Sequence, residues 1–167
     1  MLHLDMRRIF TLLIPALTVL LVWLVWPFFL SAGGQVERVQ QKLVSQAEKR
    51  NWLEAKKFLA ADFEDQWGHN RNDVIELATA AFEGTLYLNI DWTTAEVTEN
   101  ENIVKVRGTA KMNGSGGGAT PLIIKKVNEL TEPWVFTWTK EGWKPSDWKL
   151  LSMKNAALEN VAFPEGF

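Results

Sequence analysis

Cysteine is absent from the 167 residues, and this absence excludes several structures and chemistries at once. Without cysteine the chain forms no disulfide, has no thiol nucleophile and binds no metal through thiolates. It also has no residue that could carry the lipid of a lipoprotein. The fold must therefore be stabilised by its core alone, for which nine tryptophans and nine phenylalanines supply large apolar surfaces.

The chain also has few histidines and little net charge. The chain holds two histidines and a formal charge of −2, which gives no reason to expect a nucleic-acid partner. His69 lies alone in a polar loop, so a metal site there would need several carboxylate partners. Residues 114–119 formally match a dinucleotide-binding fingerprint, but no strand–helix–strand unit surrounds them. We expect no metal and no cofactor, and we predict a loop over residues 113–118.

A long uncharged apolar run, from Ile9 to Leu30, is the clearest positive feature. As a helix at about 1.5 Å per residue it measures roughly 33 Å, which matches a hydrocarbon core of about 30 Å. Arg7 and Arg8 precede it and favour a cytoplasmic N-terminus, residues 1–8, with the rest of the chain in the periplasm or outside the cell. We predict a retained signal-anchor, a single transmembrane helix over 9–30; the alternative is a cleaved signal peptide ending near Ser31–Gly33.

The residues after this run predict one domain. A linker over 31–35 is followed by the domain proper, 36–154, and by a weakly patterned tail, 155–167. Apolar residues recur at helical spacing over 36–47, 52–60 and 72–82, with Asn70 or Asn72 as the cap of the third helix and Gly84 at its end.

Beyond Gly84 the apolar period changes from 3.6 to 2. This period predicts strands over 86–92, 104–112, 134–139 and 148–153, with a bulge just after Trp92, where the alternation slips by one residue. Residues 120–130 fit either a short helix or an edge strand. The fold class is therefore α+β: an N-terminal transmembrane helix, then three helices packed on a curved antiparallel sheet.

Two stretches resemble a known family. The helix–turn–helix with Trp52–Ala55 and Phe58–Phe63, and the closing strand and turn over Phe136–Lys144, are similar to the nuclear-transport-factor-2-like (NTF2-like, SnoaL-like, ketosteroid-isomerase-like) superfamily. The resemblance covers about Val36 to Met153 and implies a cone-like, cystatin-like domain. That superfamily contains isomerases, dehydratases and non-catalytic binding modules.

In the isomerase branch a carboxylate soon after the second helix acts as the base, and Asp65 is the residue near that position. The tyrosine and second acid of that branch have no counterpart here. We therefore expect a non-enzymatic domain that binds a ligand or assembles with another protein. The alternative is a lyase or isomerase that acts on a small hydrophobic molecule, with Asp65 as general base.

Tryptophan supplies the candidate binding residues. Alternation places several aromatic rings on inward strand faces, where they either fill the core or line a pocket for a small apolar ligand. The pocket candidates are Trp67, Tyr87, Trp92, Trp134 and Trp138. The outward face of the same sheet is a candidate homodimer interface, with Lys105, Arg107, Thr109, Val135 and Thr137.

Overall fold

The computed structural model describes Leu17, Val19, Leu20, Val22 and residues 30–159. The chain divides after Ser31 into two compact units, and each is described by itself. Within the described residues, no helix has both the length and the apolar character needed to cross a membrane. Most of the transmembrane helix expected over 9–30 lies outside the described residues, as do residues 1–8 and the end of the tail, residues 160–167.

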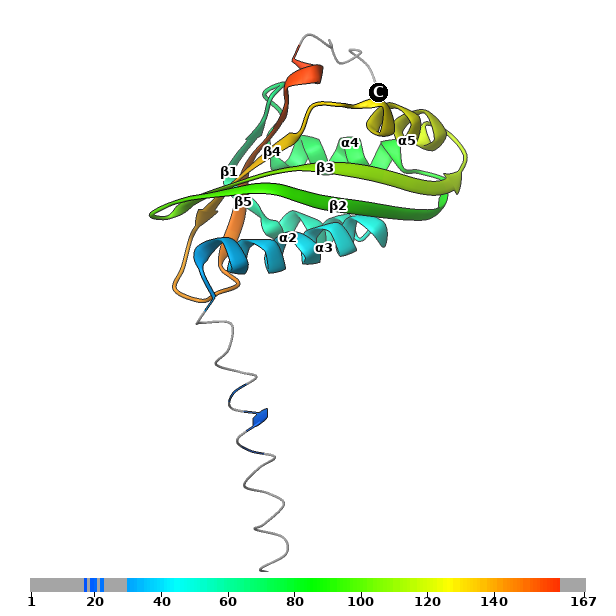
Figure 1. Cartoon of the computed structure of the whole chain (residues 1–167). Coiled ribbons are helices and arrows are strands. Elements are labelled where there is room, and N and C mark those ends of the chain that lie inside the picture. Colours follow the sequence, from blue (N-terminus) through cyan, green and yellow to red (C-terminus); the bar gives the residue numbers. More distant parts are fainter. Residues whose placement is uncertain (1–16, 18, 21, 23–29, 160–167) are drawn as a thin grey trace, which may run out of the picture. The chain divides into compact units, whose positions relative to one another are not determined.

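A mixed five-stranded sheet forms the larger unit (Figure 1). Its spatial order is β1-β5-β4-β3-β2, so β1 and β2 are the two edge strands. Neighbouring strands are antiparallel except β1, which runs parallel to β5. The strands are β1 (Leu59–Asp65), β2 (Thr85–Asn100), β3 (Ile103–Gly116), β4 (Trp134–Lys140) and β5 (Trp148–Asn155).

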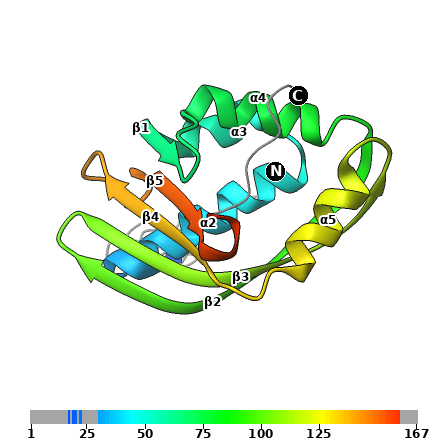
Figure 2. The same ribbon diagram turned by 90° about the horizontal axis from the view of Figure 1, so that it is seen from above.

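The helices of this unit gather on the inner side of the curved sheet. Figure 2 shows α2 lying within the curve, with α3 and α4 beyond it and α5 beside the far half of β3. Val36 and Val39 of α2 meet Val104 and Val106 of β3 in the core, together with Trp138. The helices are α2 (Ala32–Glu48), α3 (Trp52–Ala55), α4 (Arg71–Ala81) and α5 (Thr120–Glu129), with 3-10 turns η2 (Lys56–Phe58) and η3 (Ala156–Leu158).

The second predicted helix is much shorter than expected. It ends at Ala55, continues as a 3-10 turn and gives way at Leu59 to β1, where the sequence had predicted helix to about Ala60. Strand β1 pairs with β5 far along the chain, and this pairing overrides the local helical pattern. The expectation of a purely antiparallel sheet is therefore wrong, because β1 adds a parallel edge.

Other elements extend past their predicted bounds. Helix α2 begins at Ala32, so most of the expected 31–35 linker is helical. Strand β3 continues through most of the predicted glycine-rich loop to Gly116, which pairs with Thr85. The ambiguous 120–130 segment is the helix α5. Leu86 is 79% exposed and lies where the β2–β3 register shifts, between Thr85 and Tyr87.

Local sequence signals predicted the ends of elements more accurately than their lengths. Asn70 is the N-cap of α4, and its side chain forms a reciprocal capping box with Asp73. Gly84 follows this helix with a φ of 75°, a left-handed conformation in which glycine is favoured. The predicted bulge after Trp92 is also present, since the β2–β3 register shifts between Thr94 and Glu96.

Candidate functional site

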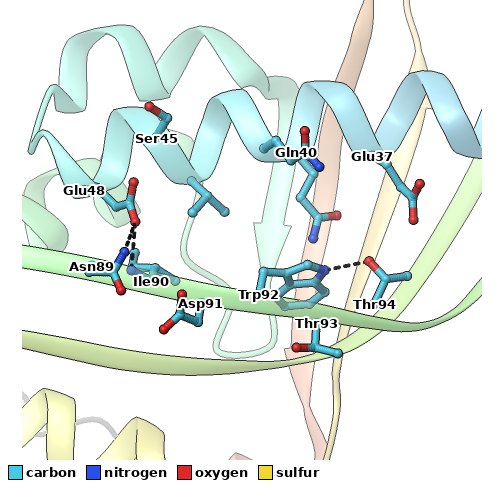
Figure 3. Close-up of a pocket in the computed structure, with 12 residues that line it drawn as sticks. Glu37, Gln40, Ser45, Glu48, Asn89, Ile90, Asp91, Trp92, Thr93 and Thr94 are labelled. Carbon is cyan, nitrogen blue, oxygen red and sulfur yellow. Dashed lines mark hydrogen bonds between the residues drawn. The ribbon is translucent and has the colours of Figure 1, made fainter.

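A groove runs between α2 and the edge strand β2 (Figure 3). Its volume is about 560 Å³, within the roughly 300–1,000 Å³ range of small-molecule sites. One wall is a single face of α2, whose lining residues recur at helical spacing; the other is a continuous stretch of β2. The lining residues are Glu37, Gln40, Gln41, Val44, Ser45 and Glu48 of α2 and Asn89, Ile90, Asp91, Trp92, Thr93 and Thr94 of β2.

The carboxylate of Glu48 links α2 to β2 through hydrogen bonds. Its Oε1 accepts hydrogen bonds from the backbone N–H of Ile90 at 2.9 Å and from Nδ2 of Asn89 at 3.0 Å, as Figure 3 shows. Because β2 is an edge strand, its outward backbone groups have no neighbouring strand and need other partners. The Glu48 carboxylate supplies one and thereby fixes the spacing of helix and strand at this point of the groove.

Trp92 presents a fixed aromatic surface in the groove. Its Nε1 donates to Thr94 Oγ1 at 3.0 Å, and its ring stacks on Phe136 of β4 with 4.8 Å between centroids. The stacking reaches across Gly108 of β3, where an added β-carbon would lie 2.5 Å from Cζ2 of Trp92. Only glycine at position 108 leaves room for the indole, so β3 helps to set the ring's orientation.

Gln40 is the most unusual group of the groove. The residue is 2% exposed, yet neither Oε1 nor Nε2 has a hydrogen-bond partner in the described part of the chain. A buried polar group without a partner costs about 1–3 kcal/mol, so such groups are rare in folded proteins. An amide offers both a donor and an acceptor, and Gln40 belongs to the lining of the groove.

The groove carries charge of one sign. Glu37 and Glu48 on α2 contribute carboxylates, and none of the twelve lining residues is lysine, arginine or histidine. Asp91 alternates with Trp92 along β2, so its carboxylate points to the opposite face of the strand. Around a concave surface, charges of the same sign reinforce each other and draw in counter-charges. The site therefore combines an acidic rim, an aromatic ring and a buried amide. No group of three or more potential metal ligands occurs among the described residues.

Asp65, the sequence-derived candidate base, lies elsewhere, at the end of β1. The residue is 5% exposed, and its carboxylate stabilises the turn that leads into α4. Oδ1 accepts from the backbone N–H groups of Trp67 and His69, each at 2.9 Å, and Oδ2 lies 2.9 Å from His69 Nδ1. The structure thus brings Asp65 and Trp67 together, but in a turn outside the groove.

The remaining pocket candidates are scattered. Trp138 is fully buried in the core, and its Nε1 has no hydrogen-bond partner within the described residues. Trp134 packs edge-on against Phe136, with 6.4 Å between ring centroids. Tyr87 is 53% exposed at the start of β2. Of the five candidates, Trp92 alone lines the groove.

Sequence reasoning missed the helical wall of the groove. Glu37, Gln40, Gln41, Ser45 and Glu48 look like the solvated face of an amphipathic helix, because their spacing and polarity are typical of one. The only sequence signal was an unbroken polar stripe along 37–48. This stripe forms one wall of the groove only because β2 packs beside it.

A second hollow lies beside α3 and α4, also of about 560 Å³. Trp52 and Phe82 line it with 5.7 Å between their ring centroids. None of the buried polar atoms found without partners in the described residues belongs to its lining. The groove between α2 and β2 is therefore the stronger candidate site.

Comparison with solved structures identifies the fold of the described domain. No family model and no curated protein sequence matches the chain. Among solved structures, Bd1075 of Bdellovibrio bacteriovorus matches with a TM-score of 0.56 at 9% identity, over 72% of this chain and 40% of that one. The chain thus spans well under half the length of Bd1075.

Two further matches are shorter proteins. A proposed dehydratase of the NTF2-like family from Streptomyces avermitilis has a TM-score of 0.52 at 16% identity, over 72% of this chain and 91% of that one. A protein of unknown function with a cystatin-like fold, from Nostoc punctiforme, has a TM-score of 0.53 at 9% identity, over 72% and 86%. These likenesses show the fold: the described domain has an α+β, cystatin-like fold, as the sequence predicted.

Proposed function

We propose that this protein is a membrane-tethered, non-enzymatic domain that binds a small polar molecule in the groove between α2 and β2. The observation that carries the proposal is the buried amide of Gln40, which lines the groove without a partner among the described residues. A ligand that pairs with this amide would recover the free energy that its burial costs. The polar lining favours a polar ligand over the apolar one expected from the tryptophans.

The tether is proposed from the sequence. The uncharged run over residues 9–30 is long enough to span a bilayer, and Arg7 and Arg8 favour N-in insertion, with the binding domain outside the cytoplasm. A domain in that place without cysteine relies on its packed core. That core is present, with Trp138 and Trp148 fully buried at its centre.

Two other expectations receive less support. A lyase or isomerase would need Asp65 as a free base, but the Asp65 carboxylate already accepts hydrogen bonds from two backbone N–H groups. The homodimer through the outer sheet face stays a prediction. Its candidate residues are Lys105, Arg107 and Thr109, which are exposed, and Val135 and Thr137, which are half-buried.

The substitution Gln40→Met tests the proposal, since methionine keeps the size of the side chain and removes both unpartnered atoms. We expect the ligand-free protein to gain about 1 kcal/mol of unfolding free energy, because a buried polar group without partners has been removed. Thermal and urea unfolding of the full chain in mild detergent measure this change. Gln46→Met, at a position of α2 outside the groove, is the matched control.

Binding is the second measurement. A library of small polar fragments, screened by ligand-observed NMR against the full chain, should yield binders that Gln40→Met weakens about tenfold and Gln46→Met leaves unchanged. Fragments that bind both variants equally, or a loss of stability in Gln40→Met comparable to that of a core cavity, would show that Gln40 has a packing role only.

A further inference from the structure

We propose that the groove selects an organic cation, namely a primary amine or guanidinium group carried on a planar, amide-bearing body. This inference rests on the groove being the binding site, and it names the class of ligand from the charge and geometry of the lining. Three features carry it, each from a different part of the groove: the carboxylates, the indole ring and the buried amide.

The carboxylates come from the α2 wall. Glu37 has no ion-pair partner among the described residues. Glu48 adds a second carboxylate, one oxygen of which accepts a hydrogen bond from the β2 backbone. With no basic side chain in the lining, an anionic ligand would meet only repulsion, whereas a cation gains from each carboxylate.

The indole and the amide define the rest of the ligand. Trp92 is held by Thr94 and Phe136, so its ring surface is presented without loss of side-chain freedom on binding. Such a surface attracts a planar group or a cation. Gln40 offers one donor group and one acceptor group from the buried side of the groove, which is the complement of another amide.

Three probes that share a benzamide body and differ in the charged group at the para position test the selection. They are 4-(aminomethyl)benzamide, which is cationic, 4-methylbenzamide, which is neutral, and 4-carboxybenzamide, which is anionic. Binding to the full chain in nanodiscs of zwitterionic phosphatidylcholine is measured by calorimetry, with empty nanodiscs as the blank. We expect the cation to bind roughly tenfold more tightly than the neutral probe, since partly exposed ion pairs each contribute a few-fold. The anion should bind more weakly than either.

Variants locate the selection in the groove. Glu37→Gln should weaken the cation about threefold and leave the neutral probe unchanged. Glu129→Gln, a glutamate on the exposed surface of α5, is the matched control and should alter neither. Gln40→Met should weaken the cation and the neutral probe alike, because both carry the amide.

The outcomes separate this inference from the function on which it rests. Equal binding of the cationic and neutral probes, with both weakened by Gln40→Met, overturns the cation selection and keeps the binding site. A cation effect that Glu129→Gln reduces as much as Glu37→Gln does also overturns the selection, because general surface charge then explains it. Failure of all three probes to bind, or binding indifferent to Gln40→Met, overturns both.

Discussion

Two buried polar side chains behave in opposite ways in this domain. The carboxylate of Asp65 is surrounded by donors, with two backbone N–H groups on one oxygen and His69 beside the other. The amide of Gln40 has no partner in the described part of the chain. The first arrangement is typical of a residue that stabilises a turn, whereas the second is rare in folded proteins. This contrast moves the functional hypothesis from Asp65 to Gln40.

The structural role of Asp65 is testable with Asp65→Asn. The amide keeps one acceptor oxygen but loses the charge that strengthens the bonds to Trp67 and His69. We expect the unfolding free energy to fall by about 1–3 kcal/mol, as for other hydrogen bonds to charged groups. Urea unfolding measures the change, and Asp62→Asn, at an exposed position of the same strand, is the control. An unchanged stability would mean that the turn does not depend on the carboxylate, and would restore Asp65 as a candidate base.

At the scale of elements, α5 protects an open edge of the sheet. Strand β4 pairs with β3 only from Ile103 to Gly108, so the later part of β3 lacks a neighbour on that side. Asn128 of α5 fills the gap. Its Oδ1 accepts from the backbone N–H of Met112, and its Nδ2 donates to the Met112 carbonyl, both at 2.8 Å. One side chain thereby imitates a strand, and satisfies backbone groups that would otherwise be open to pairing with another chain.

Asn128→Ala should expose this edge. We expect the Met112 amide to exchange its hydrogen roughly two- to tenfold faster, because the bond that protects it contributes about 0.5–1.5 kcal/mol. Hydrogen exchange followed by mass spectrometry or NMR measures the rate. Asn113→Ala, at the next residue of β3, is the control and should leave the Met112 rate unchanged. If Met112 exchanges at the same rate in Asn128→Ala, the amide is protected by another group.

The elements also show how far local sequence signals extend. The N-cap of α4, narrowed to Asn70 or Asn72, the glycine after the helix and the bulge after Trp92 were predicted, because each depends on backbone preferences of a few adjacent residues. Strand β1 was not predicted, and its first two residues, Leu59 and Ala60, were predicted as helix. Its residues Leu59 and Asp65 pair with Leu150 and Met153, and no local pattern reveals partners so distant along the chain.

At the scale of the whole molecule, the chain consists of two compact units with different chemistry. The first ends at Ser31 and contains the uncharged apolar run, and the second is the described α+β domain. We expect the first unit to hold the protein in the membrane. In that case the protein needs no buried interface with a partner to remain at the membrane surface.

Membrane extraction tests the tether. The full chain should stay in the pellet after carbonate treatment of membranes, and protease added from outside should digest the domain. Leu20→Arg should shift part of the protein to the soluble fraction, since a charge at mid-span costs about 2.5–3.5 kcal/mol of insertion free energy. Leu53→Arg, at an exposed position of α3, is the control. A wash-out of the unaltered protein, or a mature N-terminus near Gly33, would contradict the tether and favour a cleaved signal peptide.

The amino-acid sequence by itself determined the α+β class, the ends of α4 and the existence of an apolar segment, because these depend on the periodicity and conformational preferences of neighbouring residues. The tertiary structure alone decided the parallel edge strand and the groove. The two walls of the groove, residues 37–48 and 89–94, are polar and unremarkable in isolation. They form a candidate site only when packing brings them together and buries the Gln40 amide without a partner among the described residues, and spacing along a chain does not encode such proximity.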